Sequence, residues 1–159
     1  MTDRTGSGAD PPGDRADHPE AGRYFSLDAS LAAAGEGVYV DYERDVDPVE
    51  LVPGLEFRPV VGDRFMVNFV RYETHTEAPR HAHEEEQITF VIDGEFEFDL
   101  DGDVRTMRRG AAAVVPPGVP HGARTLETTC FEIDVFDPPR RVLLEMMRSR
   151  SEARPETTT

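Results

Sequence analysis

The chain is 159 residues long and carries 32 acidic and 17 basic residues, which gives a formal net charge of −15. This length fits one domain of about 100–150 residues with short extensions, and the negative charge excludes nucleic acid and anionic membrane surfaces as expected partners. No apolar run reaches the roughly 18–20 residues of a membrane span, and the N-terminus has no secretory apolar region, so we expect a cytoplasmic protein.

All of the basic residues are arginine, because the sequence contains no lysine. Strong acidity without lysine is typical of proteins adapted to high salt, although a GC-rich genome also favours arginine. We interpret the composition as a sign of a halophilic source, with genome composition as the alternative. At molar salt the Debye length falls to about 3 Å, so the surface charge would hardly repel a small anionic substrate.

The two ends of the chain, residues 1–22 and 151–159, are expected to be disordered, because they are rich in polar residues, Pro and Gly and contain almost nothing apolar. His18 lies in the first of these tails and is a weak ligand candidate. Residues 23–45 form an N-terminal extension, in which Ser26 is placed to cap a short helix over 27–34.

From Val38 onward, short runs of β-branched and aromatic residues alternate with turns of Gly, Pro and Asp. So many short runs at close spacing predict an all-β sandwich or barrel over residues 46–138. Asp93-Gly94 and Asp101-Gly102 each predict a tight hairpin. The expected strands are VYVDY, LEFRPVV, RFMVNFVRY, ITFVI, EFEFDL, AAVVP and CFEIDVF.

The C-terminal part of the ordered chain carries a lone cysteine and a helical pattern. Cys130 lies in an apolar run with nothing nearby that favours a thiolate, so we expect a buried structural thiol. Residues 139–150 follow a pair of prolines and have helical spacing. We expect the helix to pack one stripe on the barrel, formed by Val142, Leu143, Met146 and Met147.

Three of the five histidines and one glutamine point to a metal site. His81 and His83 are one residue apart, so on a strand both side chains project from the same face. Gln87 follows four residues later, and His121 comes after the stiff turn Pro116–Pro120. Imidazole and amide ligands suit several divalent first-row metals, and the ion is expected to be Ni, Zn, Mn or Fe. One carboxylate of the run Glu84–Glu86 is an alternative oxygen ligand to Gln87.

The spacing of these residues resembles the two motifs of the cupin superfamily. His81, His83, Gln87 and Gly94 are similar to the first motif, with Gln where many members have Glu, and Gly110, Pro116-Pro117-Gly118 and His121 are similar to the second. The resemblance implies an all-β single cupin barrel (a double-stranded β-helix or jelly roll) with a short N-terminal helix and a C-terminal helix. It also implies one divalent metal ion on His81, His83, Gln87 and His121.

Two positions depart from the motifs. His75 stands where the family usually has glycine, and Thr125 where asparagine is common; neither is a ligand position. We expect His75 to be a solvent-facing turn residue, with a role beside the metal ligands as the alternative.

Four neutral ligands leave the ion its full charge, which makes it a strong Lewis acid that favours anionic oxygen ligands from a substrate. This favours hydration, isomerisation or lyase chemistry on a small carboxylate- or hydroxyl-bearing molecule. Oxygen activation stays open, because iron and nickel accept the same ligands.

The segment from Asp134 to Arg140 resembles the D-x-F-x-P-P-R ending of the pectin-degradation cupins, which open the ring of 4,5-unsaturated monouronates. The resemblance implies that Asp134 moves a proton, that Phe136 forms an apolar wall and that Arg140 holds a substrate carboxylate. The alternatives are a cupin dioxygenase and a non-catalytic cupin that binds or senses a small molecule.

The strand that carries Gln87 predicts a partner. Gln87, Thr89 and Val91 share one face, whereas the opposite face carries Ile88, Phe90 and Ile92 and is too apolar to be left in water. Either the N-terminal strands cover this face or a second copy of the chain does, and we expect a homodimer.

Overall fold

The computed structural model describes residue 24 and residues 35–153. The chain divides into two compact units, Met1–Val38 and Tyr39–Thr159, and the helices and strands given below all belong to the second. His18, the helix expected over 27–34 and the tail 1–22 lie outside the described residues.

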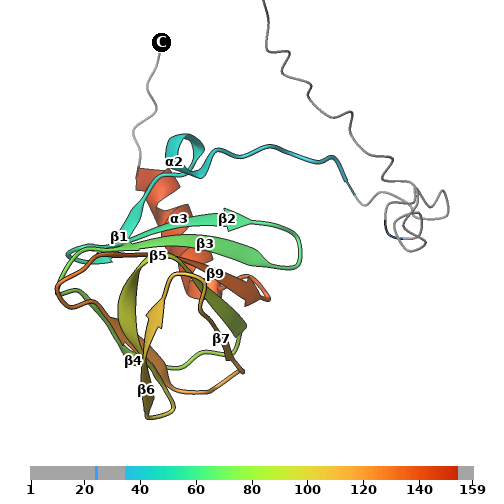
Figure 1. The fold of residues 1–159 in the computed structure, drawn as a ribbon. Coiled ribbons are helices and arrows are strands. Elements are labelled where there is room, and N and C mark those ends of the chain that lie inside the picture. Colours follow the sequence, from blue (N-terminus) through green and yellow to red (C-terminus); the bar gives the residue numbers. More distant parts are fainter. Residues whose placement is uncertain (1–23, 25–34, 154–159) are drawn as a thin grey trace, which may run out of the picture. The chain divides into compact units, whose positions relative to one another are not determined.

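The second unit is an antiparallel β-barrel with a helix at each end of the barrel sequence (Figure 1). The predicted all-β barrel is therefore confirmed. In chain order the elements are α2 (Tyr42–Asp45), β1 (Val49–Val52), β2 (Leu55–Val61), β3 (Met66–Tyr72), β4 (Glu77–His81), β5 (Glu86–Leu100), β6 (Asp103–Arg108), β7 (Ala112–Val115), β8 (His121–Arg124), β9 (Cys130–Asp137) and α3 (Arg141–Ala153).

The strands form two sheets that share the long strand β5. Its first half lies between β9 and β7, and the strands there follow the order β1-β2-β3-β9-β5-β7. Its second half lies between β6 and β8, and β4 pairs with β8. We call these the first and the second sheet. Because one strand belongs to both, the inner faces of the two sheets enclose a common interior.

The hairpin predicted at Asp93-Gly94 is wrong, since β5 runs through this dipeptide without turning back. The pairing of β5 with β9 has an irregularity between Val91 and Asp93, and Gly94 has a φ of +74°. A Cβ atom at Gly94 would lie 2.0 Å from the backbone oxygen of Thr129. Glycine here lets the strand bend from the first sheet into the second. The hairpin predicted at Asp101-Gly102 is confirmed, with Leu100 opposite Asp103.

The start of the second unit differs from the expected strand VYVDY. Residues 39–41 are not in a strand, and Tyr42–Asp45 is the short helix α2. The Asp41 carboxylate accepts hydrogen bonds from the backbone nitrogens of Glu43 and Arg44. This cap provides hydrogen-bond acceptors for two backbone amides at the start of the helix. It therefore favours the helix, although the neighbouring valine and tyrosines have a high β propensity.

Helix α3 packs against strands β3 and β9 of the barrel. Leu143 is buried against Met66 and Phe136, with Leu144 and Met146 partly buried at the same contact. Val142, which the helical spacing places in the packed stripe, is 47% exposed. The helix is therefore rotated so that Leu144 takes the place expected for Val142. It also ends later than predicted, at Ala153 instead of residue 150.

The main core fills the end of the barrel away from α3. Its buried members come from both sheets and include Phe96, Phe98 and Cys130. Cys130 is 3% exposed, and burial raises the pKa of its thiol to about 12. The expected burial of this thiol is confirmed.

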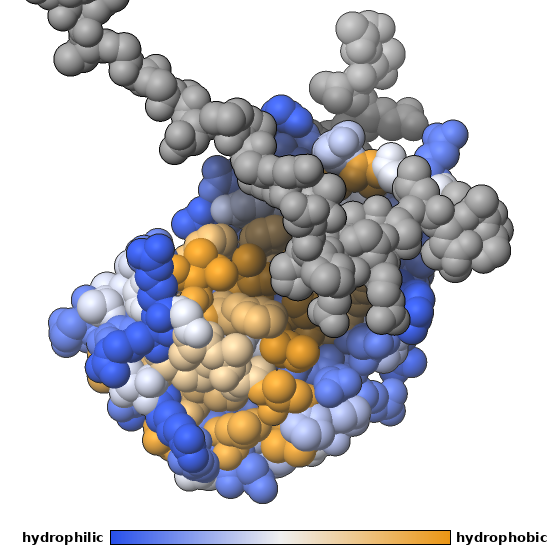
Figure 2. All heavy atoms as spheres, turned by 45° about the vertical axis from the view of Figure 1, so that its right-hand side comes forward, coloured by the Kyte–Doolittle hydropathy of each residue, from blue (hydrophilic) through white to orange (hydrophobic). Residues whose placement is uncertain are grey.

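The outer face of the first sheet is apolar across several strands, and Figure 2 shows a face of the molecule where hydrophobic side chains gather. The register places Val114, Ile88, Val135 and Val67 side by side, with Phe90, Ile133 and Phe69 in the next row. We call these seven residues the outer apolar face. Phe90 is 40% and Val114 53% exposed. Strands β1 and β2 extend the sheet at its edge, so they do not cover this face.

Candidate metal centre

The three motif histidines converge on one point inside the barrel. His81 is the last residue of β4, His121 the first of β8, and the two are opposite each other in the pairing of these strands. His83 follows in the loop that leads to β5. The nearest ring nitrogens of the three lie within 4.8 Å of one another. Three imidazoles at this separation suit a single divalent transition-metal ion.

Each of these imidazoles is held by a backbone carbonyl two residues away. The Nδ1 atoms of His81, His83 and His121 lie 2.7, 2.9 and 2.9 Å from the oxygens of Pro79, Glu85 and Val119. A carbonyl only accepts, so in each ring Nδ1 carries the proton and Nε2 keeps its lone pair. This is the arrangement that fixes the tautomer and orientation of metal-binding histidines.

The side-chain amide of Gln87 completes the set. Its nitrogen donates to Thr89 Oγ1 at 2.7 Å and to Asp134 Oδ1 at 2.8 Å, so its oxygen Oε1 is directed at His83. That oxygen lies 3.0 Å from His83 Nε2. With Nδ1 protonated, two lone pairs therefore face each other. The buried Nε2 of His121 also has no hydrogen-bond partner among the described residues. Such lone pairs are stabilised by a cation, so these four side chains fit a metal ion.

The environments of His83 and His121 favour the uncharged imidazole that binds metals. Burial lowers the pKa of His121 to about 4, and burial together with the positive charge of Arg140 lowers the pKa of His83. At neutral pH neither ring needs to lose a proton to accept an ion. These two rings are therefore available as neutral ligands.

Asp134 accepts a hydrogen bond from the side-chain amide of Gln87. On β9 it is opposite Asn68 of β3 and Thr89 of β5, so the three share the inner face of the first sheet. Its Oδ1 accepts from both Gln87 and Thr89, and Oδ2 receives no hydrogen bond from the described residues. Burial raises the pKa of Asp134 to about 6, against the lowering effect of its two hydrogen bonds.

Phe136 and Arg140 follow Asp134 along the chain, and Phe136 is opposite Gln87 in the pairing of β9 with β5. The ring of Phe136 meets the ring of His83 edge-on at 5.7 Å, and the Arg140 guanidinium lies 5.7 Å from the Phe136 centroid. Both line the same pocket as Asp134. All seven residues singled out by the motifs and the final strand thus come together at one place in the barrel.

Glu85 belongs to the run Glu84–Glu86, which the sequence offered as an alternative source of an oxygen ligand without choosing one residue. It is buried, its carboxylate lies 3.3 Å from Arg140 Nη1, and it accepts the backbone N–H of Arg141 at the start of α3. The glutamate therefore positions Arg140 and is not a substitute for the Gln87 oxygen. A run of three glutamates has no pattern that marks the middle one.

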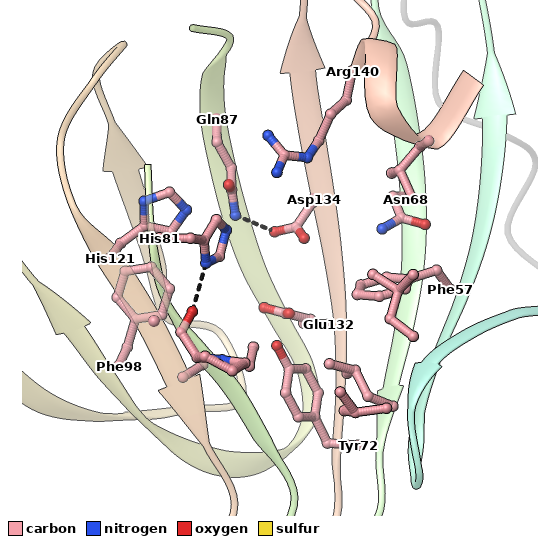
Figure 3. Close-up of a pocket in the computed structure, with 18 of the residues that line it drawn as sticks. Phe57, Asn68, Tyr72, His81, Gln87, Phe98, His121, Glu132, Asp134 and Arg140 are labelled. Carbon is pink, nitrogen blue, oxygen red and sulfur yellow. Dashed lines mark hydrogen bonds between the residues drawn. The ribbon is translucent and has the colours of Figure 1, made fainter. Parts of the chain in front are cut away.

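The pocket beside the histidines has a volume of about 340 Å³. Figure 3 shows His81 and His121 on one side of it, Asn68 and Phe57 on the opposite side, and Arg140 above Asp134. Between these walls lie Glu132 and Tyr72, and the deeper lining is apolar. Asn68, Tyr72 and Glu132 were not predicted as site residues. Glu132 shares a strand and an inward parity with Asp134, but Asn68 and Tyr72 join the site only through the pairing of β3 with β9.

The two positions that depart from the motifs lie away from the ligands. His75 has a φ of +54°, so it adopts the backbone conformation for which glycine is usual, and its side chain is 63% exposed beside Glu127. The expected solvent-facing turn residue is confirmed. Thr125 is buried, and its hydroxyl accepts from the Thr76 nitrogen at 3.0 Å and donates to the Glu73 oxygen.

Comparison with known proteins matches residues 68–135 to the family model described as "Cupin domain". An RmlC-like cupin from Shewanella frigidimarina has 26% identity and a TM-score of 0.61 over 67% of this chain and 96% of that one. KdgF from Halomonas sp. has 29% identity and a TM-score of 0.62 over 69% and 99% of the two chains. The polyketide cyclase RemF from Streptomyces resistomycificus has 25% identity and a TM-score of 0.57 over 64% and 80%.

Proposed function

We propose that this chain, which matches a cupin domain over residues 68–135, is a metal-dependent enzyme that opens the ring of 4,5-unsaturated uronates. The observation that carries the proposal is a buried carboxylate, Asp134, between the metal-ligand amide of Gln87 and the pocket that Arg140 borders. KdgF, an unsaturated-uronate-linearising cupin, is similar over 69% of this chain, which supports the same choice.

The reaction is an isomerisation and needs no second reactant. The bond between C1 and the ring oxygen breaks, the C1 hydroxyl loses its proton and becomes an aldehyde, C4 gains a proton, and the ring oxygen remains on C5 as a ketone. A metal ion held by His81, His83, Gln87 and His121 would supply Lewis-acid polarisation of the substrate oxygens. The protein must therefore supply one group that moves a proton and one that orients the carboxylate.

Asp134 suits the proton transfer. Both of its hydrogen bonds fall on Oδ1, which leaves Oδ2 as the atom that takes a proton from the substrate hydroxyl and returns it at C4. Thr89 and Gln87 hold the carboxylate in one orientation, so the transfer does not require the side chain to rotate into place.

Arg140 suits the substrate carboxylate. Glu85 accepts from Nη1, and the guanidinium lies over the ring of Phe136. The remaining N–H groups form a charged fork at the pocket rim. Because the net charge of the chain is −15, a fixed local cation is needed to draw in an anion.

The test is the loss of ultraviolet absorbance of 4,5-unsaturated galacturonate in the presence of metal-loaded protein. The wild type should accelerate the loss, Asp134→Asn should remove most of the acceleration, and Asp103→Asn, an exposed carboxylate in the β5–β6 turn, should retain it. If the absorbance falls no faster with wild-type protein than in buffer alone, the proposed uronate reaction is wrong. Binding of a sugar acid without turnover would then favour the sensory alternative.

A further inference from the structure

Two polar side chains on the wall across from the histidines have hydrogen-bonding atoms that nothing in the described protein uses. Both the amide nitrogen and the amide oxygen of Asn68 lack a partner, as does Oε2 of Glu132. Asn68 is 0% and Glu132 3% exposed, and both line the pocket. Burying an unpaired polar group costs free energy. Asn68 is also the single asparagine of the chain.

The sheet register explains why both side chains face the pocket. Asn68 is opposite Asp134, and Val70, two residues further along β3, is opposite Glu132. Asn68 and Glu132 are therefore diagonal neighbours on the inner face, with side chains roughly 7 Å apart. Figure 3 shows the amide of Asn68 directed towards the space between it and the histidines. Two groups at this spacing reach two different oxygens of one small molecule.

The environment of Glu132 favours its neutral acid form. It lies between Val70 and Val91 in the inward rows of the sheet, and burial raises the pKa of the carboxyl well above its usual value. The Tyr72 hydroxyl donates to the carboxyl, which leaves Oε2 to donate its own proton. A neutral donor in an acidic protein binds a hydroxyl or carbonyl oxygen without repelling a substrate carboxylate.

We propose that Asn68 and Glu132 form a recognition subsite for hydroxyl oxygens of the substrate. The substrate class is then a small acid with at least two hydroxyl groups, its carboxylate at Arg140 and its hydroxyls on the β3–β9 wall. The inference rests on the proposed function only in taking this pocket as the substrate site. It assigns the discrimination between hydroxylated and plain carboxylic acids to a wall that contains no metal ligand.

Calorimetry with metal-loaded protein tests the subsite without turnover. The probes are D-galacturonate and cyclohexanecarboxylate, which share a six-membered ring and a carboxylate but differ in hydroxyl groups. The wild type should bind galacturonate more tightly than cyclohexanecarboxylate. Asn68→Leu should lower the affinity for galacturonate by at least about tenfold and change the affinity for cyclohexanecarboxylate by less than about twofold. A wild type without a preference, or a variant that keeps its preference, overturns the subsite.

Thermal unfolding separates recognition from a structural role. Since the Asn68 amide has no protein partner, Asn68→Leu should keep or raise Tm. Thr125→Val, which removes a buried hydroxyl that does have partners, should lower Tm and leave galacturonate binding unchanged. A fall in Tm for Asn68→Leu with unchanged galacturonate affinity would show that the amide is structural.

Variants of Glu132, on the neighbouring strand β9, give a second test of the subsite. They can replace Asn68→Leu if that variant does not fold. Glu132→Leu should lose galacturonate affinity, and Glu132→Gln, which keeps two hydrogen-bonding atoms, should retain it. Loss in both variants would mean that the charge or the packing of Glu132 matters and would reject the hydrogen-bonding role. These binding measurements do not depend on turnover of uronates by the wild type. A failure of the proposed reaction can therefore be told apart from a failure of the proposed subsite.

Discussion

The amide nitrogen of Gln87 donates to Oδ1 of Asp134 at 2.8 Å, and this bond decides which end of the amide faces the histidines. Many proteins with the first cupin motif have glutamate at this position. A glutamate here would direct one carboxylate oxygen at Asp134, which has no proton to donate when ionised. The glutamine is therefore linked to Asp134, and the two form one unit of the site.

Gln87→Glu tests this link. In metal-free protein the two carboxyl groups must share a proton, so the variant should lose about 1–3 kcal/mol of unfolding free energy at pH 8. The loss should shrink at pH 5, because a shared proton binds more tightly in the folded state and its stabilisation disappears as the pH rises. Urea unfolding in EDTA at the two pH values measures it. Adding Asp134→Asn, which restores a donor, should recover most of the stability, and an uncoupled double mutant would contradict the link.

His121→Ala tests the metal centre itself. Protein purified without an affinity tag should hold close to one divalent metal ion per chain, and the variant should lose most of it, because one of three imidazole ligands is removed. Elemental analysis by mass spectrometry measures the content and names the metal. His75→Ala removes an exposed histidine outside the cluster and should keep the ion. Full retention in His121→Ala would remove the proposed coordination.

The convergence of the three histidines could be predicted from the sequence because it depends on local geometry. The spacing of His81 and His83 and the stiff turn before His121 fix where each side chain points within a few residues of the strand ends. The inward parity of Gln87 and Thr89 follows from the period of a strand in the same way. These features needed no knowledge of which strands pair.

The features that the sequence did not show depend on pairing between distant segments. Asp93-Gly94 has the composition of a hairpin turn, but Thr129 and Cys130 approach Gly94 so closely that the dipeptide becomes a bend within β5. Asn68 and Glu132 join the site only because β3 and β9 are neighbours. A local pattern cannot show such neighbours, so the polar wall across from the histidines became visible only in the fold.

Glu132→Gln should change the pH dependence of stability in a definite direction. The folded-state pKa of Glu132 lies above its unfolded value, so above about pH 4.3 the unfolded wild type ionises while the folded one keeps its proton. Wild-type stability therefore falls as pH rises, by up to about 1.4 kcal/mol per pH unit from this group, and the glutamine variant lacks this loss. Urea unfolding of both proteins from pH 4 to 8 should show the variant gaining relative to the wild type. A constant difference would mean that Glu132 titrates normally.

Salt should stabilise the protein if its composition reflects a saline environment. A net charge of −15 on one chain repels itself in the folded state. Raising KCl from about 0.1 to 1 M shortens the Debye length from about 10 to 3 Å and should raise Tm by several degrees. An unchanged or lower Tm at high salt would favour genome composition as the reason for the missing lysines.

The outer apolar face of the first sheet predicts a homodimer. Its residues are contributed by four adjacent strands, and Phe90 and Val114 are exposed near its middle and edge. Apolar surface of this extent is stabilised by contact with a second copy that presents the same face. Sedimentation at micromolar concentration should give twice the 17.7 kDa mass of one chain. Phe90→Glu should give monomers, because it places a charge in that contact. Val104→Glu changes a residue of β6 that is 55% exposed, against 40% for Phe90, and should leave the dimer intact. A wild type that sediments only as a monomer would mean that this face is not a contact between copies.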